Sequence, residues 1–176
     1  KNLNLRNSKF VADLSVGILI GSGSNVDIDN VHTGGYIKGR YHVGAIAGVL
    51  SHSTVKNSYN TAKGCADEQG GIFIGKASNT SISNSYNNAP FIVDCSKGYV
   101  PNRNAPLDNE TADTITLENV YHKATFTSTS PDTKHEVMLV LKNNAKSMNI
   151  INSFYYDIEP NRRSEERRVG KECRSR

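Results

Sequence analysis

The chain contains no tryptophan, and its 176 residues include only three cysteines, two methionines and five prolines. No apolar run approaches the ~18 residues that a membrane-spanning helix needs, so we expect no membrane insertion. Hydrophobic residues make up 36% of the chain, whereas glycine, asparagine, serine and threonine are abundant. This composition argues against a helical bundle and favours many short strands joined by turns. Neither an initiator methionine nor a signal-peptide pattern opens the sequence, which starts within strand-like residues (Leu3, Leu5), so we expect a fragment.

The excess of positive charge lies mostly in the tail, residues 163–176. This tail, RSEERRVGKECRSR, shares nothing with the preceding sequence, and its first four residues can be encoded by AGATCGGAAGAG. We interpret it as a translated sequencing adapter rather than a charged disordered end or a short helix, and exclude it from the fold argument. It holds six of the 21 basic and three of the 17 acidic residues, which leaves 15 and 14 and a net charge of +1. A nearly neutral body gives no electrostatic basis for binding nucleic acid.

An internal repeat with a constant period organises the first half of the chain. The hexapeptides VGILIG, VGAIAG and GGIFIG begin at Val16, Val43 and Gly70. Their glycines keep the same phase and are Gly17, Gly44 and Gly71 for the first position and Gly21, Gly48 and Gly75 for the second. Thirteen residues after each first glycine comes an asparagine, with a β-branched residue two before it and a ring two after it. Five positions held in phase over three periods indicate a true repeat.

The asparagine half of the motif extends to six copies. Their asparagines are Asn7, Asn30, Asn57, Asn84, Asn119 and Asn152, and the steps between them lengthen after Asn84. Copies after Asn84 lack the glycine half, and two stretches rich in turn-forming residues, 95–113 and 127–135, are predicted to be loop insertions. A strand-like segment, EVMLVLK at 136–142, follows the second insertion.

Each repeat is interpreted as short extended pieces, because sequences such as VDIDN alternate apolar and polar residues with the period of a half-buried strand. A unit of this size cannot bury its own apolar side, but stacked copies can. We therefore predict an all-β parallel β-helix, or β-solenoid, with coils of roughly 27 residues about 4.8 Å apart. The solenoid domain spans 1–160, with clear repeats at 16–90 and degenerate coils at 1–15 and 91–160.

The repeated asparagines are predicted to be structural. In a stack of coils, identical amides lie above one another and can both donate and accept, forming a ladder along the axis. Asparagine also tolerates the left-handed backbone conformation that a corner requires. We favour this role over ligand binding for all six.

The segments VGILIG…VDIDNVH, VGAIAG…TVKNSYN and GGIFIG…SISNSYN resemble the GLUG motif, which runs roughly G-G-L-V-G, then a gap, then a valine or isoleucine near Asn-Cys/Ser-Tyr. The match covers 16–90 and departs from the pattern at Ala45, at Ala47 and after Asn84. Such repeats occur in large bacterial surface and secreted proteins, including adhesins and the non-catalytic parts of certain immunoglobulin A peptidases. The resemblance implies an extracellular or cell-surface β-solenoid segment and carries over no catalytic residue.

Few residues are candidates for catalysis or metal binding. His32, His42 and His52 are spaced by ten, which does not match the coil, so we interpret them as surface residues rather than metal ligands. Asp27 and Asp29 alternate along one strand and point outward, as paired carboxylates for calcium or acid–base chemistry would.

The equivalents of this acidic pair in neighbouring coils are Lys56 and residues 79–83, which supply no partners, so a solvated face is the better interpretation. The sequence has no Gly-Lys-Ser/Thr loop, Gly-x-Ser-x-Gly elbow or His-Glu-x-x-His pair, and GSGSN at Gly21 is interpreted as a turn. We predict no catalytic residue, no cofactor and no metal. Outside the tail only Cys65 and Cys95 remain; their spacing permits a disulfide between adjacent coils, and two free buried thiols fit equally well.

Two features offer contact surfaces. The rings that follow the asparagines are predicted to form a column, which we expect to lie in the core. On the outside, the same rings could stack on sugars. The members of this ring column are His32, Tyr59, Tyr86, Tyr121 and Phe154. The apolar run has an inward set (Leu19, Ile46, Phe73), but its other parity is apolar too. A strand apolar on both sides is normally covered on both sides. Either a later segment such as 136–142 covers it, or it is a contact surface.

The sequence therefore predicts a non-catalytic repeat segment of a bacterial surface or secreted protein that serves in adhesion or as a spacer. Its expected partners are a host glycan, a matrix protein or other segments of the same long chain. The alternative is an accessory region of a large secreted peptidase or polysaccharide-degrading enzyme. A free-standing β-helix hydrolase or lyase is the least favoured hypothesis, because no convergent set of acidic or basic residues can be assembled.

Overall fold

The computed structural model describes residues 2–67, 70–89, 91–93, 103–107, 112–124, 136–137 and 144–157. The regular structure in these ranges is all strand, without a helix. The strands are β1 (Leu3–Val11), β2 (Leu14–Gly17), β3 (Ile20–Ser24), β4 (Asp27–Asp29), β5 (Val31–Gly39), β6 (Tyr41–Gly44), β7 (Ala47–Ser51), β8 (Thr54–Lys56), β9 (Tyr59–Asn60), β10 (Lys63–Ala66), β11 (Gly71–Asn88), β12 (Phe91–Val93), β13 (Arg103–Leu107), β14 (Ala112–Ala124), β15 (Glu136–Val137), β16 (Asn144–Ile151) and β17 (Phe154–Asp157).

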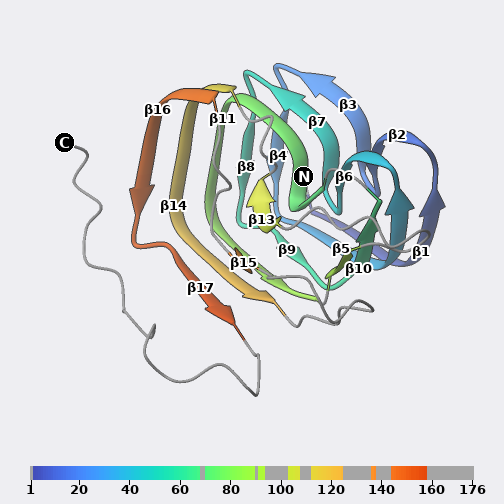
Figure 1. Ribbon diagram of the computed structural model, residues 1–176. Helices are drawn as coiled ribbons and strands as arrows, with labels where there is room; N and C mark the ends of the chain where they lie inside the picture. Colours follow the sequence, from blue (N-terminus) through green and yellow to red (C-terminus); the bar gives the residue numbers. More distant parts are fainter. Residues whose placement is uncertain are drawn as a thin grey trace.

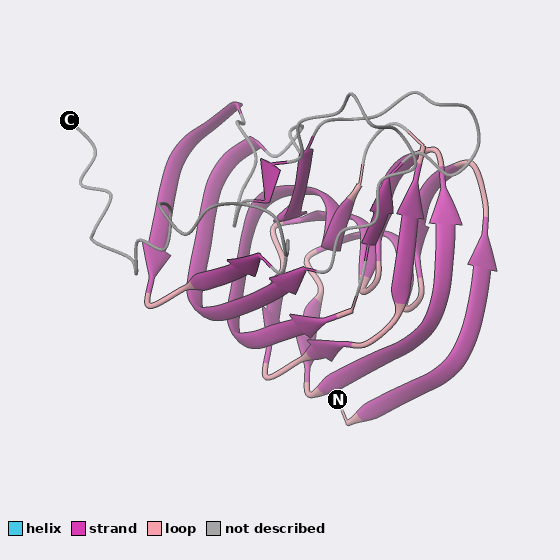
Figure 2. Cartoon of the chain, turned by 60° about the horizontal axis from the view of Figure 1, so that its bottom comes forward, coloured by secondary structure: helices cyan, strands magenta, loops and turns pink. Residues whose placement is uncertain are grey.

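The described strands pair in parallel, each with the strand one repeat further along the chain (Figure 1). One wall of the solenoid runs from β1 through β5 to β10 and β12. Another runs from β3 through β7 to β11, and a third from β4 through β8 to β11, β14 and β16. Figure 2 shows the coils side by side along one axis. The predicted parallel β-solenoid is confirmed.

The register reproduces the repeat. Gly17 pairs with Gly44, its equivalent one full period further along the chain, in the β2–β6 pair. In the later coils the step between paired residues is longer, as for Ile82, which pairs with Leu117. The predicted insertion at 95–113 is not entirely loop, because it contains β13, which pairs with β11, and the first residues of β14.

The first copy of the asparagine motif is shifted from its predicted position. Leu3 pairs with Val31, so the equivalent of Asn30 is Asn2, and the assignment of Asn7 is wrong. Asn7 lies inside β1, where the register shifts between Leu5 and Ser8. The error has a simple cause. Two leucines, Leu3 and Leu5, precede Asn7 just as two apolar residues precede the asparagines of later copies. In the first coil, however, these leucines come after the corner, which lies at Asn2.

Two apolar clusters fill the first coils of the solenoid, and they explain why the hexapeptide is apolar on both parities. Ala45 belongs to one cluster, while Ile46 and Ala47 belong to the other. The chain bends at this point, so successive side chains enter opposite clusters. In the second copy the run is therefore covered on both sides by the protein's own coils and is not a contact surface. The described part of EVMLVLK, strand β15, pairs with β13 rather than with this run.

Four hexapeptide glycines stand where two backbones touch: Gly17, Gly44, Gly48 and Gly75. A Cβ atom added to Gly44 would overlap the carbonyl oxygen of Ala47, across the bend. A Cβ atom added to Gly75 would overlap the backbone of His42 in the preceding coil. Any side chain at these two positions would push neighbouring segments apart, which explains why glycine recurs in phase.

Candidate functional site

One corner of the solenoid is formed by the asparagine column, in which every member has a left-handed backbone. The φ angles are 55° for Asn30, 52° for Asn57, 47° for Asn84, 53° for Asn119 and 45° for Asn152. Asparagine is among the few residues that adopt this conformation at low cost, because its short side chain bonds locally. The corner that the sequence predicted at these residues is present, and Asn2 (φ 61°) continues it.

Side-chain amides join the asparagine column along the axis. Asn30 donates through Nδ2 to Asn2 Oδ1 at 2.7 Å, and Asn119 donates to Asn84 Oδ1 at 2.9 Å. Asn84 makes a longer contact of 3.4 Å with Asn57 Oδ1. The ladder predicted from the sequence therefore exists over most of its length.

A serine follows the asparagine in several copies, and its hydroxyl bridges two coils. Ser58 Oγ donates to the carbonyl oxygen of Lys56 at 2.8 Å and accepts from the backbone N–H of Val31 at 3.1 Å. Ser85 Oγ donates to the Ser83 carbonyl at 2.7 Å and accepts from the backbone N–H of Ser58 at 3.1 Å. Both serines are buried. The Asn-Ser pair is thus a structural unit that turns the chain and bonds the coil to its neighbour.

A second left-handed column lies five residues before the first, or six in the coil of Asn119, and sequence analysis missed it. Its members and φ angles are Asn25 (56°), His52 (48°), Asn79 (45°) and Asp113 (62°). A hydroxyl residue follows several of them, and Ser53 repeats the bridge: its Oγ accepts from the Val26 backbone N–H at 3.1 Å. The residue type changes from coil to coil, so a search for identical residues passes over it. The signal in the sequence was a polar residue (Asn, His or Asp) at this position of each coil, followed by Ser or Thr in three of the four copies.

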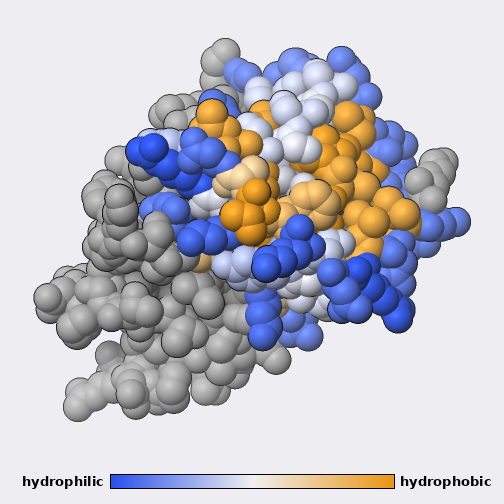
Figure 3. Space-filling model, turned by 90° about the vertical axis from the view of Figure 1, so that its right-hand side faces the viewer, coloured by the Kyte–Doolittle hydropathy of each residue, from blue (hydrophilic) through white to orange (hydrophobic). Residues whose placement is uncertain are grey.

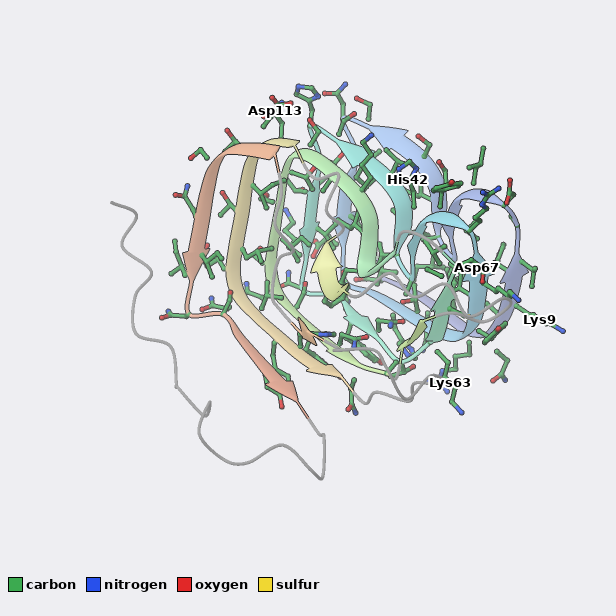
Figure 4. The ribbon with its side chains drawn as sticks, viewed as in Figure 1. Lys9, His42, Lys63, Asp67 and Asp113 are labelled. Carbon is green, nitrogen blue, oxygen red and sulfur yellow. The ribbon has the colours of Figure 1, made fainter. Side chains whose placement is uncertain are left out.

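The three evenly spaced histidines occupy three different places, as their spacing predicted. His32 lies in the ring column, and His52 lies in the second corner column. His42 (φ 50°) and Ser15 (φ 51°) form a third left-handed pair, because β2 and β6 are in register there. Figure 4 marks His42 and Asp113, which lie at different corners. In the described part of the chain, no three His, Cys, Asp or Glu side chains come close enough to hold a metal ion.

From His32 to Tyr121 the ring column faces solvent, so its predicted place in the core is wrong; the side chain of Phe154 lies outside the described part of the chain. The His32 and Tyr59 rings stack with centroids 4.1 Å apart, and those of Tyr59 and Tyr86 with centroids 5.0 Å apart. Tyr86 is 43% exposed and Tyr121 is 41% exposed. The residue between each corner asparagine and its ring points inward, so strand alternation turns the ring outward.

The stacking of the ring column limits what it can bind. Interplanar angles of 11° for His32–Tyr59 and 6° for Tyr59–Tyr86 mean that the ring faces cover one another. Solvent therefore meets ring edges and phenol hydroxyls, not faces. A sugar that stacks on an aromatic residue needs a free face, so this stacked part of the column does not offer the surface considered from the sequence.

His32 is fixed at the end of the ring column by two hydrogen bonds. Its Nδ1 lies 2.7 Å from Asn4 Oδ1, and its Nε2 lies 2.7 Å from Thr61 Oγ1. Partial burial, together with the nearby Arg6 guanidinium, lowers the pKa of His32 below its ordinary value. The imidazole therefore serves as a stacking and hydrogen-bonding group between coils.

The acidic pair on β4 has partners that the sequence interpretation did not supply. Asp27 accepts a hydrogen bond from the Thr54 hydroxyl, and its Oδ1 lies 3.5 Å from Lys56 Nζ. Asp29 accepts from Asn57. All three partners come from the next coil. The ion pair is exposed, and such pairs contribute about 0–1 kcal/mol, so Asp27 behaves as part of a solvated face.

A buried polar ladder, also missed from the sequence, lies three residues after each corner asparagine. Its members, Thr33, Asn60, Asn87 and His122, are fully buried. Thr33 Oγ1 donates to Asn60 Oδ1 at 2.9 Å, and Asn60 Nδ2 donates to Asn87 Oδ1 at 2.7 Å. Backbone groups of Ala62 complete the bonding of Asn60. The ladder satisfies polar groups inside the solenoid that would be costly to bury alone.

The ladder ends at His122. Asn87 Nδ2 lies 3.3 Å from His122 Nδ1, which therefore accepts and leaves the ring proton on Nε2. Among the described residues, Nε2 finds no hydrogen-bond partner. Burial lowers the pKa of His122 to about 4, because a charged imidazolium would lose its hydration. The histidine is thus held neutral inside the solenoid.

Cys65 is buried and disulfide-bonded, so it is not the free thiol that the sequence left open. The other two cysteines, Cys95 and Cys173, lie outside the described residues.

None of the described residues forms a helix of the length and apolarity needed to cross a membrane. No protein-family model matches the chain, and no curated protein or solved structure matches it either.

Proposed function

We propose that this chain is a non-catalytic repeat segment of a bacterial cell-surface or secreted protein, serving as a structural spacer or an adhesive element. The observation that carries the proposal is the direction of its side-chain ladders. The asparagine column, the bridging serines, the buried polar ladder and the ring column all bond one coil to the next. Side chains arranged in this way stiffen a rod along its length, because each coil depends on its neighbours.

Two further features support a location on the cell surface or outside the cell. The resemblance of residues 16–90 to GLUG repeats points to surface or secreted proteins of bacteria. The disulfide at Cys65 fits an oxidising compartment, where such bonds form and persist. An extracellular or cell-surface location accounts for both.

The lateral face beside the asparagine column would be the adhesive surface. It presents repeated amides and phenol hydroxyls, among them Asn84, Asn119, Tyr86 and Tyr121, all exposed. A host glycan or matrix protein would bind there by hydrogen bonds to these groups and to ring edges.

The test is binding of the purified, folded chain to arrays of host glycans and matrix proteins. Adhesion predicts a signal that falls with Tyr121→Ser and persists with Ser22→Ala, which alters an exposed residue on β3. A clean negative from a chain with normal β-sheet circular dichroism would leave the spacer role. A catalytic domain in the uninterrupted gene would instead assign the segment to a large secreted enzyme as an accessory region.

A further inference from the structure

The wall formed by β1, β5 and β10 carries three lysines on its outer face. Lys9 pairs in register with Tyr36, and Tyr36 pairs with Lys63, so these residues form one row across adjacent coils. Lys38 follows two residues after Tyr36 and therefore points to the same side of the strand. Between them Ile37 is fully buried in a core cluster, which fixes the inner side of the wall. The lysines therefore point away from the core.

The side chains of this row are accessible and close together, and we call Lys9, Tyr36, Lys38 and Lys63 the basic patch. Lys9 and Lys63 are exposed, and the other two members are partly buried. Figure 4 shows Lys9 and Lys63 extending outward on the same side of the solenoid. Two inter-strand steps separate these two lysines, which is about 10 Å, and Lys38 lies diagonally about 8 Å from each between Cα atoms.

The charge of the basic patch is not neutralised within the described part of the chain. There, the three lysines form neither an ion pair nor a hydrogen bond with another described residue. The next acidic residues on these two outer strands, Asp13 and Asp67, come four residues after Lys9 and Lys63, which is about 13 Å along an extended strand. Like charges on neighbouring strands repel, so an anion bound across the patch would relieve a cost that the fold leaves in place.

The basic patch faces sideways from the solenoid axis. Coils stacked at either end would extend this wall and leave the lysines uncovered, so the patch does not depend on an open end. Figure 3 shows hydrophilic residues along the lower edge of the side that carries β1. The patch is also separate from the lateral face beside the asparagine column, because Tyr36 follows His32 along β5 beyond the irregular Gly35 (φ 121°).

We propose that the basic patch binds an acidic polysaccharide, with carboxylate or sulfate groups paired to the three ammonium groups and the Tyr36 hydroxyl donating to a sugar oxygen. A lysine ammonium is a compact point charge with three donors, which suits single anionic groups. Acidic polysaccharides carry their charges sugar by sugar, more sparsely than DNA, which carries one per about 1.7 Å. Three ammonium groups over about 10 Å match the sparser polymer.

The test is calorimetric titration of the full chain with dextran sulfate, with uncharged dextran as the matched polymer. We expect the sulfated polymer to bind and dextran not to bind. Raising the salt from about 0.05 M to about 0.5 M should weaken binding at least about tenfold, because exposed charges are screened. Polygalacturonate, which carries carboxylates in place of sulfates, is the second arm. The arm that binds more tightly identifies the anionic group, and binding of neither polymer overturns the proposal.

Two double variants test the place of binding. Lys9→Gln with Lys63→Gln should lower the affinity about tenfold, because each exposed ion pair contributes a few-fold. The matched control, Lys56→Gln with Lys76→Gln, removes the same charge from β8 and β11 and should change the affinity less than about twofold. Circular dichroism verifies that both fold. Residues 163–176 are present in both, so any binding by this basic tail cannot separate them.

Equal losses in the two double variants would overturn the proposal, because net charge alone would then explain binding. A DNA duplex that binds more tightly than either polysaccharide, and through the same two lysines, would also overturn it. Tyr121→Ser should leave the affinity for the acidic polymers unchanged. The basic patch and the adhesive lateral face can therefore fail independently, and each failure is recognised.

Discussion

Asn57 donates its side-chain amide to Asp29 of the preceding coil, at 2.9 Å, and not to Asn30, its equivalent in the asparagine column. The carboxylate thus replaces an amide oxygen at one step of the ladder. Bonding along the axis can therefore pass from the asparagine column to the residue beside it, even where the column itself is unbroken.

This substitution of one acceptor for another can be tested at Asp29. Asp29→Ala removes the acceptor, and we expect the free energy of unfolding to fall by about 1 kcal/mol in urea titrations. Asp29→Asn keeps an oxygen that accepts from Asn57, so most of the stability should remain. Equal losses in the two variants would show that the hydrogen bond contributes nothing and that charge alone matters.

The bridging serines should be more sensitive than surface serines. Ser58→Ala and Ser85→Ala each leave a buried backbone N–H without its acceptor, which costs about 1–3 kcal/mol. Ser22→Ala, at an exposed position, should change the free energy of unfolding by less than about 0.5 kcal/mol. Chemical denaturation of the three variants gives the comparison, and equal effects would refute the bridging role.

Glycine should be required at some repeat positions and only preferred at others. Gly44→Ala and Gly75→Ala drive a methyl group into backbone, so we expect losses above about 3 kcal/mol or a failure to fold. At Gly21 the nearest atom, the Ser15 carbonyl oxygen, lies 3.1 Å from an added Cβ atom, so Gly21→Ala should cost less. Soluble yield and thermal unfolding of all three rank the positions.

Acid should destabilise the later coils through His122. Its pKa is about 4 when folded and near 6.5 when unfolded, so the unfolded chain binds more protons between these values. Stability from this group is complete above pH 6.5 and is lost as pH falls to 4, by on the order of 3 kcal/mol. Urea unfolding at several pH values measures this slope.

The matched variant for this pH effect is His122→Asn, which keeps a group able to accept from Asn87 and does not titrate. Its free energy of unfolding should depend less on pH between 6.5 and 4 than that of the parent chain. An unchanged slope would assign the acid sensitivity to other groups.

Ring stacking on the outer face should contribute to stability despite its exposure. Tyr59→Ala removes two stacked contacts, each worth about 0.5–1.5 kcal/mol. Tyr59→Phe keeps the ring and loses only the hydroxyl, so it should unfold nearly like the parent chain. If phenylalanine is as destabilising as alanine, the hydroxyl rather than the ring carries the effect.

The sequence predicted the columns in which residue identity repeats, such as Gly17 over Gly44 and Asn84 beneath Asn119. It did not predict the corner where Asn25 and His52 alternate, because a left-handed backbone accepts several polar residues. It also placed the tyrosines on the wrong side. Which side a residue faces after a corner depends on the turn itself, and a periodicity count carries no information on that turn.

The sequence also did not predict that the apolar hexapeptide is buried by its own coils, and the reason is related. A single strand with apolar residues on both parities suggests an external cover, but here the chain bends between Ala45 and Ile46. Neighbouring side chains then enter separate clusters inside one coil. Local alternation describes a straight strand and fails where the strand bends.

The unequal spacing of the coils has a structural consequence. Ile28 pairs with Val55 across one ordinary period and Ile82 pairs with Leu117 across a longer one, yet the apolar row continues through both. The extra length leaves the row intact, so the apolar core of this wall does not depend on a constant number of residues in each coil.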